Sequence, residues 1–107
     1  MATFVSTKLA FGQVAASKTA IASPSGTKWL IHEATFHNET ASPVTVQLYY
    51  NDGTSRRVHA FDVPGDDTVS LDWRGNGFVV EDGEDFEAEA SAATSINYSL
   101  DGAVRTP

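Results

Sequence analysis

Hydrophobic and polar residues alternate with a period of two along most of the chain from Lys28 onward. In Val44–Tyr50, for example, every even position is apolar, whereas Thr45 and Gln47 lie on the opposite face. No window of eleven or more residues keeps the spacing of an amphipathic helix. The pattern therefore predicts an all-β chain.

The same pattern predicts about eight short strands, of which the first two are the weakest. With the two weak candidates included, nine segments qualify: 3–11, 18–22, 28–38, 44–50, 55–61, 68–73, 78–81, 85–92 and 95–100. Turn residues separate them roughly every 8–12 residues, a spacing typical of a two-sheet antiparallel sandwich. Jelly-roll and immunoglobulin-like wiring both fit this spacing.

Three of the connections are predicted to be hairpin turns. Asn51–Thr54 contains Asn, Asp and Gly, which tolerate the positive φ of a tight turn, and we expect Gly53 to adopt it. Arg74–Gly77 is expected to form a second hairpin turn, and segments 85–92 and 95–100 are expected to pair as a third hairpin.

The chain has 107 residues, of which 41% are hydrophobic and 20% charged, so we expect residues 1–107 to form a single β-sandwich domain. Its longest apolar runs have three residues, too few to cross a membrane. The first residues lack the pattern of a secretory signal, which predicts synthesis in a cytoplasm. Residues 1–27 are rich in Ala, Ser and Thr and are expected to supply an N-terminal arm and the first strands.

Charge is distributed unevenly over the chain, whose net charge is −7. Residues 1–51 carry three lysines and two acids, whereas residues 52–107 carry four arginines and twelve acids. A phosphate backbone would be repelled by the second half, so direct binding of nucleic acid is not expected. The absence of cysteine excludes disulfides, thiol nucleophiles and thiolate metal sites.

The sequence contains no pattern that indicates catalysis. The nucleophile-elbow and phosphate-loop motifs are both missing. His32 and His37 are five residues apart on one expected strand, which would place them on opposite faces and keep them from sharing a metal ion. We therefore expect no enzyme activity, no catalytic residues, no cofactor and no metal.

The most unusual segment is 81–89, in which six of nine residues are acidic. Three interpretations are open: a calcium site, a patch that docks on a basic partner, or a turn followed by the solvent-facing side of a strand. The EF-hand spacing is not met. Candidate interface residues in this segment are Glu81, Asp82, Glu84 and Asp85.

Aromatic residues offer an alternative function. Trp73 next to a glycine-rich turn, and Tyr49 on the polar side of its strand, could stack on sugars in a carbohydrate- or receptor-binding module. Both Trp29 and Trp73 lie in apolar strand patterns, however, which favours a place in the core.

The order of elements from Lys28 to about Gly102 resembles small β-sandwich proteins of tailed-bacteriophage particles. The resemblance rests on Trp29–Ile31, Phe36–Thr40, Val44–Tyr49, Asp52–Thr54, Val63–Gly65, Thr68–Leu71, Gly77–Val80, Gly83–Glu84 and Ala88–Ala93. It implies a structural subunit that decorates the phage head, or alternatively a neck or tail accessory protein, with no catalytic residues.

The partners implied by this resemblance are other phage structural proteins and further copies of the chain, with no membrane involved. The implied location is the virion, after synthesis in the host cytoplasm. Assembly candidates in residues 1–16 are the large apolar side chains Phe4, Val5, Leu9 and Phe11. Such a segment could lie along the sheet edge of a neighbouring subunit, or it could be an ordinary first strand of its own sandwich.

Overall fold

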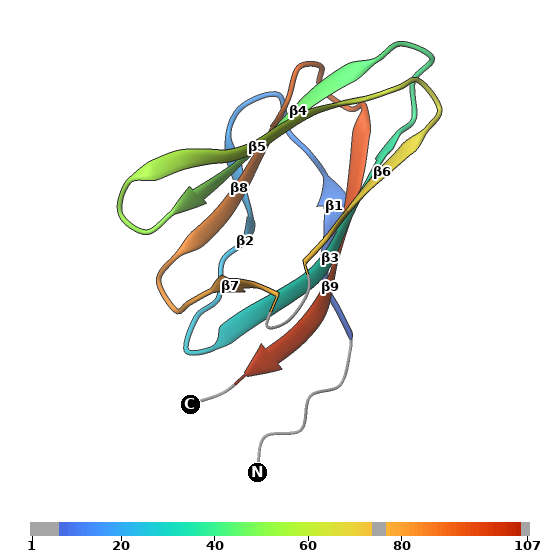
Figure 1. The fold of residues 1–107 in the computed structure, drawn as a ribbon. Coiled ribbons are helices and arrows are strands. Elements are labelled where there is room, and N and C mark those ends of the chain that lie inside the picture. The colour runs from blue at the N-terminus through green and yellow to red at the C-terminus, as the bar shows by residue number, and fades with distance from the viewer. Residues whose placement is uncertain (1–6, 74–76, 106–107) are drawn as a thin grey trace.

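A computed structural model describes residues 7–73 and 77–105, which form strands and turns without a helix (Figure 1). The strands are β1 (Thr7–Gln13), β2 (Thr19–Ala22), β3 (Lys28–Asn38), β4 (Val44–Asn51), β5 (Ser55–Val63), β6 (Thr68–Asp72), β7 (Phe78–Val80), β8 (Asp85–Ala90) and β9 (Ile96–Arg105). The all-β prediction is confirmed. The described residues include no helix long and apolar enough to span a bilayer.

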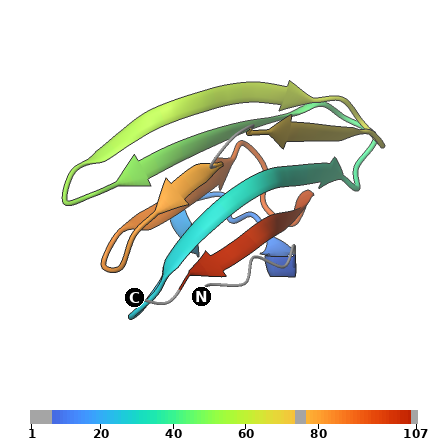
Figure 2. The same ribbon diagram turned by 60° about the horizontal axis from the view of Figure 1, so that its bottom comes forward.

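The strands form two antiparallel sheets that face each other (Figures 1 and 2). One sheet has the order β1-β9-β3-β6, with β7 also paired to β3, and the other has the order β2-β8-β4-β5. The predicted two-sheet sandwich is therefore confirmed.

The wiring is that of a jelly roll. The chain passes from one sheet to the other at every connection except β4–β5 and β6–β7. If β6 and β7 are counted as one position, the two sheets read 1-8-3-6 and 2-7-4-5, which is the order of two interlocked Greek keys. This order decides between the two wirings that strand spacing left open.

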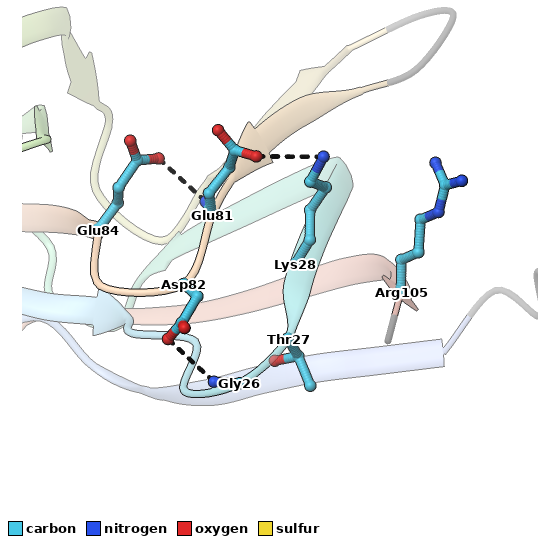
Figure 3. A pocket seen from close by; sticks show the side chains of 7 residues that line it. All are labelled: Gly26, Thr27, Lys28, Glu81, Asp82, Glu84 and Arg105. Carbon is cyan, nitrogen blue, oxygen red and sulfur yellow. Dashed lines mark hydrogen bonds and ion pairs between the residues drawn. The ribbon is translucent and has the colours of Figure 1, made fainter. Parts of the chain in front are cut away.

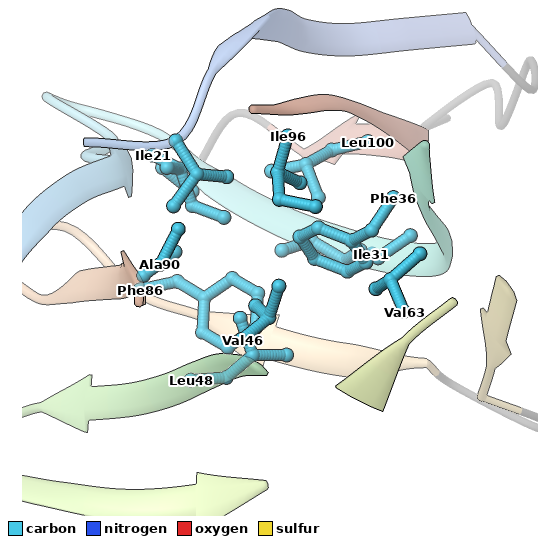
Figure 4. Close-up of a cluster of buried hydrophobic side chains, with 14 of the residues drawn as sticks. Ile21, Ile31, Phe36, Val46, Leu48, Val63, Phe86, Ala90, Ile96 and Leu100 are labelled. Carbon is cyan, nitrogen blue, oxygen red and sulfur yellow. The ribbon is translucent and has the colours of Figure 1, made fainter. Parts of the chain in front are cut away.

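The core lies between the sheets and comes from the alternating positions of their strands (Figure 4). In β4 the even positions up to Leu48 are buried and the residues between them are not, as the sequence pattern predicts. Phe36 of β3 and Phe61 of β5 meet across the sheets with their ring centroids 5.3 Å apart. The largest fully buried apolar side chains are Phe36, Phe86, Ile31, Leu48, Ile96, Leu100, Val14, Val46, Val63 and Val80.

The predicted hairpin between segments 85–92 and 95–100 is wrong. Strand β8 pairs with β2 and β4, whereas β9 pairs with β1 and β3 in the other sheet. The segment between the two strands begins at Ser91, which donates its N–H to the carbonyl of Thr45. It ends at the buried Ser95, just before β9. A period of two shows which face of each strand is buried, but it does not show which sheet the strand joins.

The second predicted hairpin, at Arg74–Gly77, is also wrong. Strand β9 covers one edge of β3, and the other edge is shared by β6, opposite residues 33–37, and β7, opposite residues 29–31. Both short strands are antiparallel to β3 and so run in the same direction. Residues 74–76 themselves lie outside the described residues.

The hairpin between β4 and β5 is confirmed. Asn51 pairs with Ser55, which leaves a three-residue turn whose central Gly53 has φ +118°. The N–H of Gly53 donates to Oδ1 of Asn51 at 2.9 Å. Farther along β5 the register shifts between the pairs Leu48–His59 and Tyr49–Arg57, so Val58 is the extra residue of a β-bulge.

Candidate functional site

The acidic segment lies at one end of the sandwich, where β7 turns into β8 beside the start of β3 (Figure 3). The end of β9 also reaches this place, and an open cavity of about 490 Å³ lies among these segments. Its lining residues are Gly26, Thr27, Lys28, Glu81, Asp82, Glu84 and Arg105. Parts of the chain far apart in sequence therefore meet around the predicted acidic residues.

The first two acids of the turn hold the segment that leads into β3. Lys28 Nζ lies 3.1 Å from Glu81 Oε1, forming an ion pair at the surface. Asp82 Oδ1 accepts the N–H of Gly26 at 2.9 Å (Figure 3). Both carboxylates therefore have partners within the chain.

The next two acids also have partners within the chain. Glu84 Oε1 accepts the N–H of Glu81 at 3.0 Å and the hydroxyl of Tyr50. Asp85 Oδ1 accepts the hydroxyl of Ser23 at 2.6 Å. Burial, followed by the hydrogen bond to Glu84, holds the pKa of Tyr50 well above its usual value. Residues 81–85, which we call the acidic turn, therefore have a structural role, because their contacts connect β8 to β4 and to the segment between β2 and β3.

No set of three or more His, Asp or Glu side chains within 7–73 and 77–105 is placed to hold a metal ion. His37 Nδ1 lies 2.8 Å from the hydroxyl of Thr68, and the ring of His59 lies 6.0 Å from that of Trp73. These two imidazoles therefore contact neighbours from β6 and from the segment just after it.

The aromatic side chains proposed to stack on sugars contact other side chains of the same chain. Trp73 is half-buried and packs against Phe78 and Phe86, at centroid distances of 5.4 and 6.2 Å. Trp29 is also half-buried and packs against the core. Tyr49 carries Lys18 Nζ over its ring, 4.4 Å from the centroid.

Polar side chains form a network on the outer face of the four-stranded sheet, the face turned away from the other sheet. Tyr49 donates its hydroxyl to Glu89 at 3.2 Å, and Ser55 donates to Glu87 at 2.7 Å. Burial is the main cause that raises the pKa of Tyr49, and the hydrogen bond to Glu89 adds to it. The last two acids of the acidic segment thus belong to a sheet surface and not to the cavity.

The N-terminal candidates separate into three groups. Phe4 and Val5 lie outside the described residues. Leu9 of β1 is half-buried and packs against the core. Phe11 of β1 is 74% exposed, with Lys8 Nζ 5.5 Å from its ring centroid. Residues 7–13 pair with β9 of their own chain, so a role in assembly stays a prediction for this segment.

Sequence reasoning missed a further exposed surface, on β5. Its residues Arg56–Ala60, which we call the β5 edge segment, are exposed at five consecutive positions although they belong to a strand. The sequence of this segment, RRVHA, lacks the alternation of apolar and polar residues found in the other strands. That missing alternation is the signal that could have identified a strand exposed on both faces.

Comparisons with known proteins identify the fold. No protein-family model matches the chain, and no curated protein is similar to it in sequence. A solved structure described as that of Bacillus endospore appendages, a family of disulfide-linked pili, is similar with a TM-score of 0.57. The two chains are 19% identical, and the match covers 97% of this chain and 88% of the other.

This likeness shows that the fold is shared with a subunit of an assembled appendage. It does not extend to the linkage named for those pili, because this sequence contains no cysteine and cannot form a disulfide. The structural match supplies no phage protein, so the phage resemblance noted from the sequence stays a prediction.

Proposed function

We propose that this protein is a non-enzymatic structural subunit that acts by packing against other subunits in a larger assembly. The observation that carries the proposal is the fold, which nearly the whole chain shares with a subunit of pili. Because a fold can host unrelated functions, the side chains must also agree with this proposal.

The contacts of the acidic turn support a structural role. A catalytic or metal site needs polar groups left free to bind a substrate or ion. Here Glu81, Asp82, Glu84 and Asp85 each contact a partner in the same chain. The acidic turn can still contribute to an interface through its charge, because a patch of like charge selects an oppositely charged partner.

We propose that the larger assembly is a phage particle and that this protein is a decoration subunit on the outside of its head. The sequence resemblance and the excess of acids in residues 52–107 support this placement. A surface facing packaged DNA would be repelled by such an excess. A neck or tail position is the alternative within the phage particle, and a carbohydrate- or receptor-binding module is the alternative outside this class.

A second candidate assembly is a non-covalent bacterial surface fibre, which the likeness to pilus subunits favours. In that case the subunits would have to be held by non-covalent contacts, since the chain has no cysteine. The sugar-binding alternative is weakened because Lys18 covers the ring of Tyr49 and Trp73 packs against Phe78.

The deciding experiment is to image the purified protein alone and after mixing with phage particles that lack it. We expect saturable, stoichiometric addition to the heads. Addition to tails alone would support the neck or tail alternative, and fibres formed without any particle would support the surface fibre. Protein that neither adds to particles nor self-assembles would overturn the proposed function.

A further inference from the structure

Strand β5 is the longest unpaired edge in the described part of the sandwich. The five-stranded sheet ends on β1, with seven residues, and on the short strands β6 and β7. The four-stranded sheet ends on β2, with four residues, and on β5, with nine. An edge strand presents backbone N–H and C=O groups that another strand can pair with.

The β5 edge segment is also open on both of its faces. In the middle of a sandwich the inner side chains of a strand are buried, but here all five residues from Arg56 to Ala60 are exposed. Val58 is 39% exposed, and the side chain of Arg56 is 65% exposed. The tip of the β4–β5 hairpin extends beyond the strands of the other sheet (Figures 1 and 2), and on the inner face of the segment the ring of His59 lies 6.0 Å from that of Trp73.

Two opposite charges share the outer face of this strand. Arg57 Nη1 donates to Gln47 Oε1 at 3.1 Å, and Asp62 Oδ1 accepts the hydroxyl of Thr45 at 2.7 Å. Gln47 and Thr45 alternate with buried residues of β4, so both belong to the outer face. Without the bulge at Val58, positions 57 and 62 would lie on opposite faces, because their separation is odd.

We propose that β5 pairs antiparallel with β5 of a second copy, around a two-fold axis at Ala60. In this register Ala60 lies opposite Ala60 of the second copy, and His59 lies opposite Phe61. Beyond the bulge, Arg57 lies opposite Asp62 of the second copy, and the reciprocal pair forms at the other end. Every opposed pair then shares a face, and the two four-stranded sheets become one.

The features that usually protect an edge select this register. Charged residues and bulges hinder unselective pairing between sheet edges. A register centred on Arg57 would place two guanidinium groups opposite each other, whereas the register centred on Ala60 gives two ion pairs and a small residue at the axis. The partner that fits the edge is therefore another copy of the chain.

This inference rests on the proposed function, since it names one interface of a self-associating subunit, but the two can fail separately. The contact is small, because it consists of two strands side by side. We expect a weak dimer, with a dissociation constant on the order of 10–100 µM, which many simultaneous contacts in an assembly would reinforce.

The test measures molecular mass by sedimentation from about 10 µM to about 1 mM protein, a range that brackets this affinity. Arg57→Asp and Asp62→Arg each place like charges opposite each other at both ends of the proposed interface. We expect each variant alone to dimerise at least about tenfold more weakly than the parent. An equimolar mixture of the two should recover the dimer, because both ends of the mixed pair then carry opposite charges.

The matched control for Arg57→Asp is Arg105→Asp, which makes the same change in charge at the end of β9, away from β5. We expect it to dimerise like the parent, and circular dichroism should show all variants folded. A parent protein that stays monomeric at about 1 mM would overturn the inference, as would single variants that dimerise normally or a mixture that stays monomeric. If particles or fibres still form in those cases, the proposed function survives and only this interface is wrong.

Discussion

Asn38 Nδ2 donates to the backbone carbonyl of Val63 at 3.0 Å, joining the last residue of β3 to the last residue of β5 in the opposite sheet. The same amide nitrogen donates to the carbonyl of Ser42 at 2.8 Å. Its Oδ1 accepts the N–H and the hydroxyl of Thr40, at 2.8 and 2.7 Å. Asn38 is fully buried, and these contacts use its complete hydrogen-bonding capacity.

Replacing Asn38 by Asp should therefore destabilise the fold strongly. The new carboxylate oxygen would face the carbonyls of Ser42 and Val63, where the amide now donates, and it would carry a buried charge if ionised. We expect the free energy of unfolding to fall by about 3 kcal/mol at neutral pH, measured by urea denaturation.

Asn97→Asp is the matched control, because Asn97 donates to Glu39 at an exposed site. We expect a loss of less than about 1 kcal/mol there. Equal losses in the two variants would contradict the role given to Asn38.

Gly53→Val tests the turn between β4 and β5. The φ of +118° is strained for any residue with a β-carbon, although no atom beyond the two adjacent residues lies within 4 Å of the place where that carbon would be. The cost thus comes from the backbone alone, and we expect a loss of about 1–2 kcal/mol. Thr54→Val, in the same turn without a positive φ, should change stability by less than about 0.5 kcal/mol. A melting temperature unchanged by Gly53→Val would show that the turn is placed wrongly.

The strand pattern was predictable because alternation is a local property. Val44, Val46 and Leu48 are buried as their spacing predicts. The sheet in which each strand lies depends on distant partners, which is why β8 and β9 were expected to form a hairpin although they belong to different sheets. Alternation also gave no sign that β6 and β7 both pair with one edge of β3.

The candidate site was predictable only as a list of acids. The sequence predicts a turn at Asp82–Glu84 between two strands, and the structure has a turn at Asp82 and Gly83, with β8 starting at Asp85. Their partners Ser23, Lys28 and Tyr50 come from three other parts of the chain. Such contacts follow from the sandwich wiring, so they could not be found before the wiring was known.

The hydrogen bond between Tyr50 and Glu84 predicts how stability changes in alkaline solution. Burial and Glu84 raise the pKa of Tyr50 in the folded protein above its unfolded value near 10. A raised pKa means that the folded state keeps its proton longer, so the contribution is complete below pH 10 and is lost as the pH rises through the folded pKa. We expect Tyr50→Phe to flatten the fall in unfolding free energy above pH 10.

Urea denaturation at several pH values from neutral to strongly alkaline provides the measurement. Tyr98→Phe is a useful comparison, since burial raises the pKa of Tyr98 without a contribution from an acid. A Tyr50→Phe curve parallel to that of the parent would show that the folded protein does not hold this proton.

Two N-terminal deletions separate the proposed arm from the first strand. Removing residues 1–16 eliminates β1 and the buried Val14, so we expect loss of cooperative thermal unfolding. Removing residues 1–6 leaves both in place, and this variant should melt like the parent protein. If Phe4 and Val5 serve in assembly, the shorter deletion should also reduce particle or fibre formation. Normal assembly of that variant would show that the arm does not include them.

The position of β9 bears on how the chain folds. It follows the other eight strands in sequence, yet it lies between β1 and β3 inside the five-stranded sheet. Until residues 96–105 have been synthesised, β1 has no strand to pair with and β3 has an open side. Folding must therefore wait for the last strand, and contacts this distant in sequence make the search slow. A chain that cannot complete its sheets early exposes its interfaces late, so a subunit becomes competent to associate only after β9 has been inserted between β1 and β3.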